Sequence, residues 1–135
     1  MAFVHKTKIR VRYGETDQMM TFRNSAALEW FEVGRTESMR AMGLPYTEME
    51  SRGVMLPVAE SRVFYRGRAV YDDELTVTTT IEMEGKARLR CAVAITKGDG
   101  SVVADGYTVH AVVNGEGKPM RPPAWFIELF NGCEG

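Results

Sequence analysis

The chain has 135 residues, the length of one ordinary domain, so we expect a single domain over residues 1–135. Hydrophobic residues make up 44% and charged residues 26%, which is typical of a globular protein and excludes a disordered chain, a collagen and a coiled coil. The 17 basic and 18 acidic residues give a formal net charge of -1, so no long-range field attracts nucleic acid. No run approaches the roughly 20 apolar residues of a membrane span, and we expect a soluble protein that is neither exported nor bound to a membrane.

Cysteine and histidine usage bounds the metal and redox chemistry. The two cysteines, Cys91 and Cys133, are too few for a disulfide framework or a four-ligand zinc site. The two histidines, His5 and His110, have no partners at the spacing of metal ligands. The sequence therefore predicts no metal site and no cofactor, and it favours the reducing cytoplasm as the location.

The amino end predicts a strand. Ile9, Val11 and Tyr13 alternate with basic residues, which is the period of a half-buried strand, and the pattern ends at Gly14. A loop of polar and then apolar residues follows, so the next element begins about ten residues later along the chain.

One long helix is predicted from about Asn24 to Met42, where apolar and small residues recur at helical spacing. Asn24 or Ser25 is the expected N-cap. Gly43 can adopt the left-handed conformation that ends a helix, and Pro45 prevents its continuation. A short helical turn is expected over residues 46–52.

The rest of the chain predicts an antiparallel sheet. Strands with period-two alternation and turn residues between them are expected at 58–65, 74–84, 87–96 and 102–113, and an extended tail from Lys118 with an apolar patch at 125–130. One helix must cover the apolar face of this sheet, which predicts an α+β fold with the sheet curled around the helix. The small Ala92 and Ala94 on the other face would let a second sheet approach, so we expect at least a dimer.

Five short motifs in chain order resemble those of a known family. They are Tyr13-Gly-Glu-Thr-Asp17-Gln-Met, Trp30-Phe-Glu-Val-Gly-Arg-Thr-Glu37, Pro57-Val-Ala-Glu60, Tyr71-Asp-Asp-Glu-Leu75 and Asp105-Gly-Tyr-Thr-Val-His110. Across nearly the whole chain, their order and spacing resemble the hotdog-fold acyl-CoA thioesterases of the 4-hydroxybenzoyl-CoA thioesterase type. The resemblance implies a long central helix wrapped by a five- or six-stranded antiparallel sheet, paired into dimers and often tetramers with active sites at the dimer interface.

The resemblance also implies two catalytic groups. Asp17 matches the family's catalytic carboxylate in the loop after the first strand, and Asn24 matches the position whose backbone amide, at the start of the long helix, stabilises the oxyanion. A thioester carbonyl is electrophilic and thiolate leaves readily, so one carboxylate can act as nucleophile or as general base. No serine-histidine-aspartate set is needed, and no GxSxG motif is present.

Substrate contacts are expected from two groups of residues. Apolar side chains around the catalytic loop would line the acyl tunnel: Met19, Met20, Phe22 and Trp30. Basic side chains after the 85–86 turn would bind the phosphates of coenzyme A, namely Lys86, Arg88 and Arg90, although a plain solvated edge explains them equally well. Relatives usually carry glycine at the position of Met20, in a turn that favours positive φ, and histidine or proline at the position of Asn24.

Other charged residues have simpler interpretations. The long helix carries charged residues at three-residue spacing, which predicts a solvated, ion-paired face: Glu29, Glu32, Arg35, Glu37 and Arg40. Glu60 is interpreted as an ion-pair partner of Arg62, with a role as a second acid as the lesser hypothesis. His110 is interpreted as a hydrogen-bonded residue of the last strand.

These patterns predict an acyl-CoA thioesterase that releases a short- or medium-chain or aromatic acid and coenzyme A. A hotdog enoyl-CoA hydratase would need a histidine soon after Asp17, and the sequence has none there. The alternative is a non-catalytic protein that binds acyl-CoA or acyl-carrier thioesters. The expected assembly is at least a homodimer, with a homotetramer implied by the resemblance, and no nucleic-acid partner.

Overall fold

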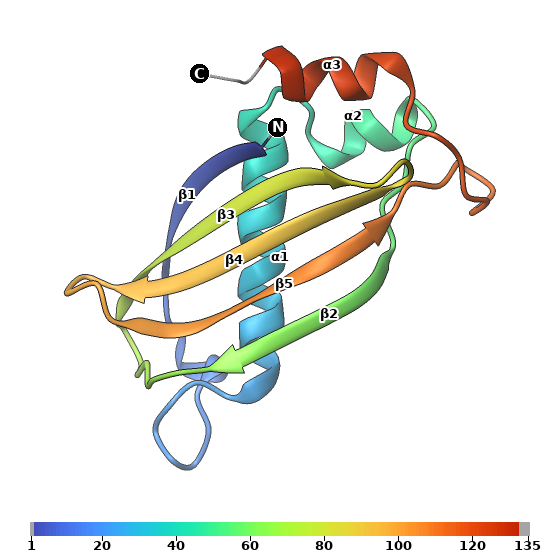
Figure 1. The fold of residues 1–135 in the computed structure, drawn as a ribbon. Coiled ribbons are helices and arrows are strands. Elements are labelled where there is room, and N and C mark those ends of the chain that lie inside the picture. The colour runs from blue at the N-terminus through green and yellow to red at the C-terminus, as the bar shows by residue number, and fades with distance from the viewer. Residues whose placement is uncertain (1, 133–135) are drawn as a thin grey trace.

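The computed structural model describes residues 2–132 and contains one antiparallel sheet with a long helix against its concave side (Figure 1). The strands are β1 (Ala2–Arg10), β2 (Val58–Tyr65), β3 (Glu74–Glu84), β4 (Arg88–Lys97) and β5 (Val102–Ala111), in the spatial order β1-β3-β4-β5-β2. The helices are α1 (Asn24–Ala41), α2 (Tyr46–Ser51) and α3 (Ala124–Gly132), with a short 3-10 turn, η1 (Tyr13–Glu15). The sheet curls around α1, as expected from a single apolar helix inserted between β1 and the other strands.

The period-two alternation of β3 and β4 sets which face of the sheet is buried. Leu75, Val77, Thr79 and Ile81 of β3 are fully buried against α1, and the residues that alternate with them lie on the outer face. The strand bounds of β2 and β3 match the sequence prediction, and those of β4 and β5 differ by one or two residues. The first strand differs more: it covers Ala2–Arg10, and Tyr13 is an exposed residue of η1.

Helix α1 ends as its sequence predicts. Gly43 has φ +91°, and the amides of Gly43 and Leu44 donate to the carbonyls of Arg40 and Met39, both at 3.0 Å. This pair of bonds is a Schellman motif, which satisfies carbonyls that the helix leaves without partners. The motif turns the chain toward α2, whose Met49 is fully buried against the same end of α1.

Gly34 allows α1 to lie close to β3. A Cβ atom at position 34 would stand 2.4 Å from Thr79 Oγ1 and 2.6 Å from Val77 Cγ1. Real Cβ atoms do not come so close, and Thr79 Oγ1 is itself buried without a hydrogen-bond partner among the described residues. Gly34 therefore determines how deeply the helix sits on the sheet.

We expect Gly34→Ala to lower the free energy of unfolding by about 1–3 kcal/mol, because the added methyl group must push α1 away from a packed sheet. Urea denaturation monitored by circular dichroism measures the change. Gly115→Ala is the matched control, since a Cβ there meets nothing within 4 Å. Equal stability of the two variants would show that α1 can shift at no cost.

The two ends of α1 pack in separate apolar clusters. The end near α2 and α3 is covered by Phe126 and Phe130 of α3, together with Met39 and Met49. The carboxyl-terminal segment is thus helical from Ala124, where the sequence analysis expected only an extended tail ending in an apolar patch. Its apolar residues cover the open end of the sheet, which gives the segment a helical face to bury. Cys133 lies outside the described residues.

Strand β2 forms one edge of the sheet and is almost entirely exposed. Seven of its eight residues are exposed, including the apolar Val58, Phe64 and Tyr65. Exposed edges with apolar side chains are sites where another strand can pair.

No helix within residues 2–132 is long and apolar enough to cross a membrane.

Candidate active site

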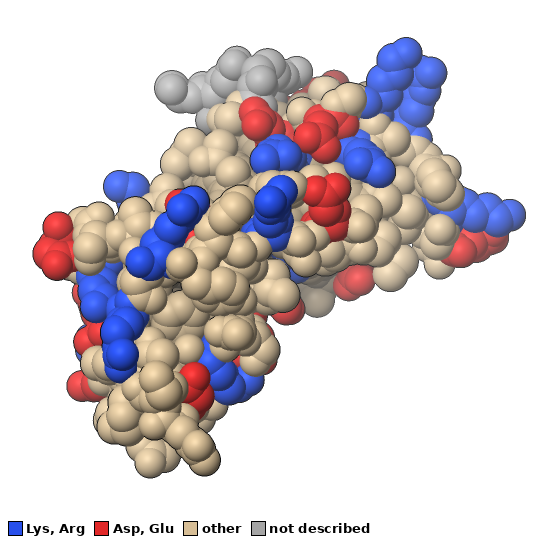
Figure 2. All heavy atoms as spheres, turned by 60° about the horizontal axis from the view of Figure 1, so that its bottom comes forward, with Lys and Arg blue, Asp and Glu red and all other residues tan. Residues whose placement is uncertain are grey.

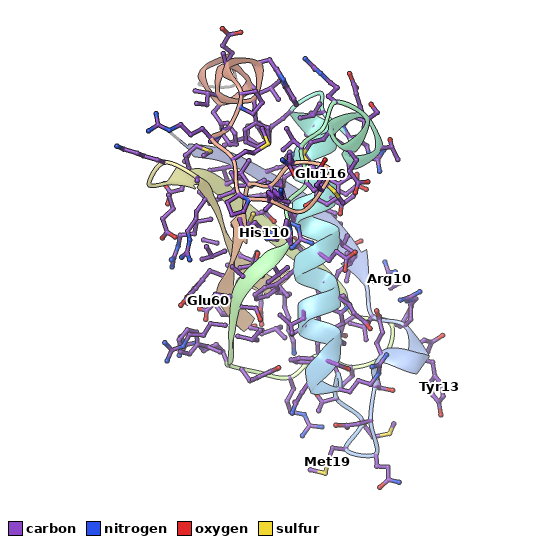
Figure 3. The ribbon with its side chains drawn as sticks, turned by 90° about the vertical axis from the view of Figure 1, so that its right-hand side faces the viewer. Arg10, Tyr13, Met19, Glu60, His110 and Glu116 are labelled. Carbon is purple, nitrogen blue, oxygen red and sulfur yellow. The ribbon has the colours of Figure 1, made fainter. Side chains whose placement is uncertain are left out.

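The loop that carries Asp17 is a tight turn at the amino-terminal end of α1. The Asp17 amide donates to the Thr21 carbonyl at 2.9 Å, and the Met20 amide donates to the Asp17 carbonyl at 3.0 Å. The Asp17 carboxylate accepts a hydrogen bond from the Met19 amide at 2.8 Å, which fixes one oxygen in an Asx turn. Asp17 is exposed, and Figure 3 shows Met19 at the outer tip of this loop.

Met20 has a strained backbone. Its φ is +67°, a left-handed conformation that glycine adopts at little cost and methionine does not. The turn therefore has the positive φ that the sequence analysis associates with this position. The side chains of Met19 and Met20 are each 68% exposed, so neither lines a cavity within this chain.

We expect Met20→Gly to raise the free energy of unfolding by up to about 1 kcal/mol, because the relief of left-handed strain outweighs the extra freedom of glycine in the unfolded chain. Met19→Gly is the control: Met19 is equally exposed but has no positive φ, so the same change should destabilise the protein. Thermal denaturation of the two variants should give opposite shifts. Shifts of the same sign would mean that the turn relaxes in solution.

The backbone amide of Asn24 is available at the start of α1. Arg23 is the N-cap and Asn24 is the first helical residue, so the expectation that Asn24 or Ser25 caps the helix is wrong. No group within residues 2–132 accepts a hydrogen bond from the Asn24 amide, because the carbonyl four residues earlier lies outside the helix. A free amide at the positive end of an 18-residue helix can stabilise an anion.

Three aromatic side chains form the floor below this loop. The Phe22 ring lies 5.1 Å from the Trp30 ring and 6.1 Å from the Tyr65 ring, between centroids. Phe22 and Trp30 are almost fully buried, so within one chain they belong to the core and not to an open tunnel. Tyr65 of β2 is partly exposed, and its hydroxyl donates to the Asn24 carbonyl at 2.9 Å. It joins the exposed edge of the sheet to the start of α1.

Glu15 is a buried carboxylate that holds the loop in place. Its side chain accepts hydrogen bonds from the Arg12 amide at 2.7 Å, the Arg12 guanidinium at 3.1 Å and the Trp30 indole at 3.0 Å. Burial opposes its ionisation, but these hydrogen bonds outweigh burial and lower the pKa of Glu15 below its ordinary value. Glu15 was not among the site residues expected from the sequence. The only indication of its role in the sequence was its position in the first motif, two residues before Asp17.

A second polar cluster lies deeper between α1 and the sheet, around Arg35. Its Nε donates to the Tyr46 hydroxyl at 2.5 Å, and Nη1 lies 3.3 Å from His110 Nε2. Thr108 Oγ1 lies 2.8 Å from the same His110 nitrogen, and His110 Nδ1 lies 2.9 Å from the Leu56 carbonyl. A guanidinium can only donate, so His110 is neutral and carries its proton on Nδ1. His110, labelled in Figure 3, is therefore hydrogen-bonded, as interpreted from the sequence.

The environments of Arg35 and Glu60 differ from those expected from the sequence. Arg35 is 8% exposed, and no carboxylate of residues 2–132 lies within 4 Å of it, so it does not belong to the solvated face. Its position in the helix turns it toward β5, whereas Glu37 and Arg40 pair at 3.4 Å on the outside. Glu60 accepts a hydrogen bond from the Tyr107 hydroxyl at 2.6 Å and forms no ion pair with Arg62, whose guanidinium lies over the Phe64 ring.

Burial lowers the pKa of His110 to about 4, and the nearby Arg35 charge acts in the same direction, against the hydrogen bond to Leu56. Between pH 6.5 and 4 the unfolded chain therefore binds more protons than the folded chain. We expect the free energy of unfolding to fall by up to about 3 kcal/mol as the pH decreases through this window. Urea denaturation across the window measures the slope.

His110→Gln should remove most of this slope, whereas His5→Asn should leave it in place. Acidic residues also titrate below pH 5, so the quantity to compare is the difference between each variant and the parent. A slope that survives His110→Gln would assign the acid sensitivity to carboxylates instead.

A sequence profile of the thioesterase-like superfamily matches residues 11–130. The chain belongs to this superfamily. It is 40% identical over 79 residues to YneP of Bacillus subtilis (strain 168), a protein with a proposed assignment as an acyl-CoA thioesterase. That match covers 58% of this chain and 57% of YneP, less than two thirds of the relative's length.

Solved structures of thioesterases share the fold. The DHNA-CoA thioesterase of Staphylococcus aureus is 28% identical, with a TM-score of 0.86 over 96% of this chain and 89% of that one. A Bartonella henselae protein proposed to be a thioesterase is 30% identical, with a TM-score of 0.82 over 89% of this chain and 99% of that one. The α+β hotdog fold implied by the sequence motifs is thus confirmed, and thioester hydrolysis is the reaction class of the family.

In this thioesterase-like chain the basic residues lie far from Asp17. Lys86 borders a hollow of about 600 Å³ beside Arg121 and α3, at the opposite end of the molecule from the Asp17 loop (Figure 1). Arg90 stacks on the Tyr107 ring at 3.9 Å on the outer face of the sheet. Arg88 is exposed at the start of β4. Helix α1, about 27 Å long, spans the molecule between these ends, so one chain does not bring the two groups together.

The surface around the Asp17 loop has no field of one sign. Figure 2 shows basic and acidic side chains interspersed over this face, with the uncharged tip of the loop protruding from it. Any binding of phosphates here must therefore rely on individual side chains. Among residues 2–132, no three His, Cys, Asp or Glu side chains gather as metal ligands.

Proposed function

We propose that the protein hydrolyses acyl-CoA thioesters, with Asp17 as the catalytic carboxylate and the Asn24 amide as the oxyanion donor. One observation carries the proposal: the exposed Asp17 carboxylate lies in the short turn just before α1, and the Asn24 amide, which has no acceptor within residues 2–132, begins that helix. Family membership supports the reaction class. The names of YneP and of the S. aureus DHNA-CoA thioesterase support coenzyme A as the carrier. The proposed acyl group is short- or medium-chain or aromatic, as expected from the sequence.

The chemistry needs no further catalytic side chain. As a general base, Asp17 takes a proton from water, the resulting hydroxide adds to the thioester carbonyl, and the tetrahedral intermediate expels the thiolate, which is then protonated. As a nucleophile, Asp17 itself adds and expels the thiolate to give a mixed anhydride, which water hydrolyses. In both routes the Asn24 amide donates to the oxygen that becomes negative.

The proposed enzyme works as a homodimer at least. The exposed β2 edge offers unpaired backbone groups together with apolar side chains, and Tyr65 links this edge to the Asn24 end of α1. A partner at this edge would cover the exposed Met19 and Met20, which supports the proposal that they line the acyl tunnel with Phe22 and Trp30. It would also be the source of Lys86, Arg88 and Arg90 for the coenzyme A phosphates. A homotetramer and a cytoplasmic location remain parts of this proposal.

The alternative is a non-catalytic protein that binds acyl thioesters. The Asx turn favours it, because one Asp17 oxygen already accepts the Met19 amide. Release of thiol from a panel of acyl-CoAs, measured with a thiol reagent, separates the two functions. Hydrolysis of at least one acyl-CoA supports the enzyme, and binding measured by calorimetry without thiol release supports the alternative.

A further inference from the structure

Arg35 is a buried cation without a counter-charge. It is 8% exposed, and no carboxylate among residues 2–132 lies within 4 Å of its guanidinium. The polar groups nearest its guanidinium are neutral, namely the Tyr46 hydroxyl, the His110 imidazole and the Thr108 hydroxyl, and the Glu32 carboxylate lies farther away than 4 Å. Burying a charge without a partner is costly, and such a charge is usually compensated by an anion.

The hydrogen bonds of Arg35 leave donors free. Nε donates to Tyr46 and Nη1 to His110, which uses two of the five N–H groups. Nη2 has no acceptor within residues 2–132. It is not sealed inside the protein either, because Thr79 Oγ1 is the one fully buried polar side-chain atom of the described residues that has no partner. Nη2 therefore faces an open space.

That space is a groove of about 200 Å³ between α1 and the β2 edge. It is lined by Leu28, Glu32, Arg35, Val58, Ser61 and Thr108. Leu28 at one end stands one helical turn after the free Asn24 amide, and Arg35 stands about 16 Å beyond Asn24 along the axis of α1. The groove thus begins near the proposed reaction centre and ends at Arg35, whose Nη2 has no acceptor within residues 2–132.

We propose that this groove holds the acyl group and that Arg35 binds a carboxylate at the far end of that group. The inference rests on the proposed function, and it makes the preferred substrates thioesters of dicarboxylic acids. The guanidinium presents fixed donors that suit a carboxylate. Tyr46 and His110 hold its other nitrogens, so Arg35 is ordered before the substrate arrives.

Glu32 provides a second test of the proposal, because its removal should change carboxylate binding in the opposite direction from the removal of the Arg35 charge. Its carboxylate lines the same groove one turn before Arg35 but does not approach it within 4 Å. A negative charge there repels a second carboxylate. Removing it should therefore strengthen the binding of a carboxylate-terminated acyl group, whereas removing the charge of Arg35 should weaken it.

The test uses non-hydrolysable thioether analogues of acyl-CoA, so that binding is measured whether or not the protein is catalytic. Two pairs of these thioether analogues differ only at the end of the acyl group that lies away from sulfur. One pair compares the decanoyl with the sebacoyl analogue, and the other compares the benzoyl analogue with the analogue derived from one carboxyl group of terephthalic acid. Calorimetry on the full chain gives the dissociation constants. We expect the carboxylate member of at least one pair to bind about tenfold more tightly or better, the range of a charged hydrogen bond.

The two pairs distinguish two routes to Arg35. A preference within the long aliphatic pair would mean that the acyl group runs along its own helix α1. A preference within the short aromatic pair would mean that the thioester lies closer to Arg35 than a path along α1 from Asn24 requires. A wild-type protein that shows no preference in either pair overturns the proposal.

The variants assign the preference to Arg35. Arg35→Met should abolish it and leave decanoyl binding within about threefold, Arg35→Lys should retain part of it, and Glu32→Gln should increase it. Equal losses for both members of a pair in Arg35→Met would show a structural role and overturn the proposal. If Arg35→Met does not fold, Arg35→Lys still decides, because a purely structural Arg35 would leave the ratio of the two dissociation constants unchanged in a folded Arg35→Lys variant. Failure of thiol release with the preference intact would remove the proposed catalysis and leave the binding site.

Discussion

Asp17→Asn should reduce thioester hydrolysis by a factor of about 10²–10⁴ if Asp17 is a general base, and by more if it is the nucleophile. The variant keeps the fold, because the asparagine side-chain oxygen can still accept the Met19 amide that now binds Asp17 at 2.8 Å. The shape of the turn is therefore preserved while the negative charge is lost. Steady-state thiol release with the best acyl-CoA of the panel measures the effect.

Asp72→Asn is the matched control for this change. Asp72 is also exposed, also in a turn, and has φ +74°, a conformation that asparagine tolerates. Its loss removes only an exposed ion pair with Arg10, at 3.8 Å, so we expect activity within about twofold of the parent. Comparable activity of the Asp17 variant and the parent would remove Asp17 from the mechanism.

The fold was predictable because its signals are local and periodic. The alternation of β3, the helical spacing of α1 and the Gly43 stop are each read from neighbouring residues, and each matches the structure. The carboxyl-terminal helix α3 was missed, because the prolines that precede it and its short length resemble a loop exit and its apolar residues form a buried face only against α1 and α2. The start of β1 was missed because Ala2 and Val4, on its exposed face, are apolar like Phe3 on the other face, so the first residues show no alternation.

The candidate site was only partly predictable. Asp17 and Asn24 were expected from the family resemblance, and the structure places both at the amino-terminal end of α1, while their catalytic roles stay a proposal. The buried Arg35 was not predictable from charge spacing, because a helix with arginine at i+3 from glutamate predicts a surface pair. Only the packing of α1 against β5 shows that Arg35 faces His110. Likewise, no local pattern separates Phe22 as a core residue from Phe22 as a tunnel wall.

The role of the Asn24 amide can be isolated by replacing the residue with proline. Asn24→Pro removes the N–H but keeps the helix, because proline is favoured at the first helical position. Arg23 already has φ -75° and ψ 151°, the extended conformation that a following proline requires. The Asn24 amide has no acceptor within residues 2–132, so no existing hydrogen bond is lost. We expect hydrolysis to fall by about 10²–10³ with little change in stability.

Asn24→Ala completes the argument, because it removes the side chain and retains the amide. If the backbone alone stabilises the oxyanion, this variant should keep nearly full activity, and the contrast between alanine and proline at one position measures the amide itself. Circular dichroism and thermal denaturation verify that both variants keep α1. Loss of activity in Asn24→Ala would assign the role to the side-chain amide, and full activity in Asn24→Pro would place the oxyanion donor elsewhere, with the adjacent free amide of Ser25 as the next group to test.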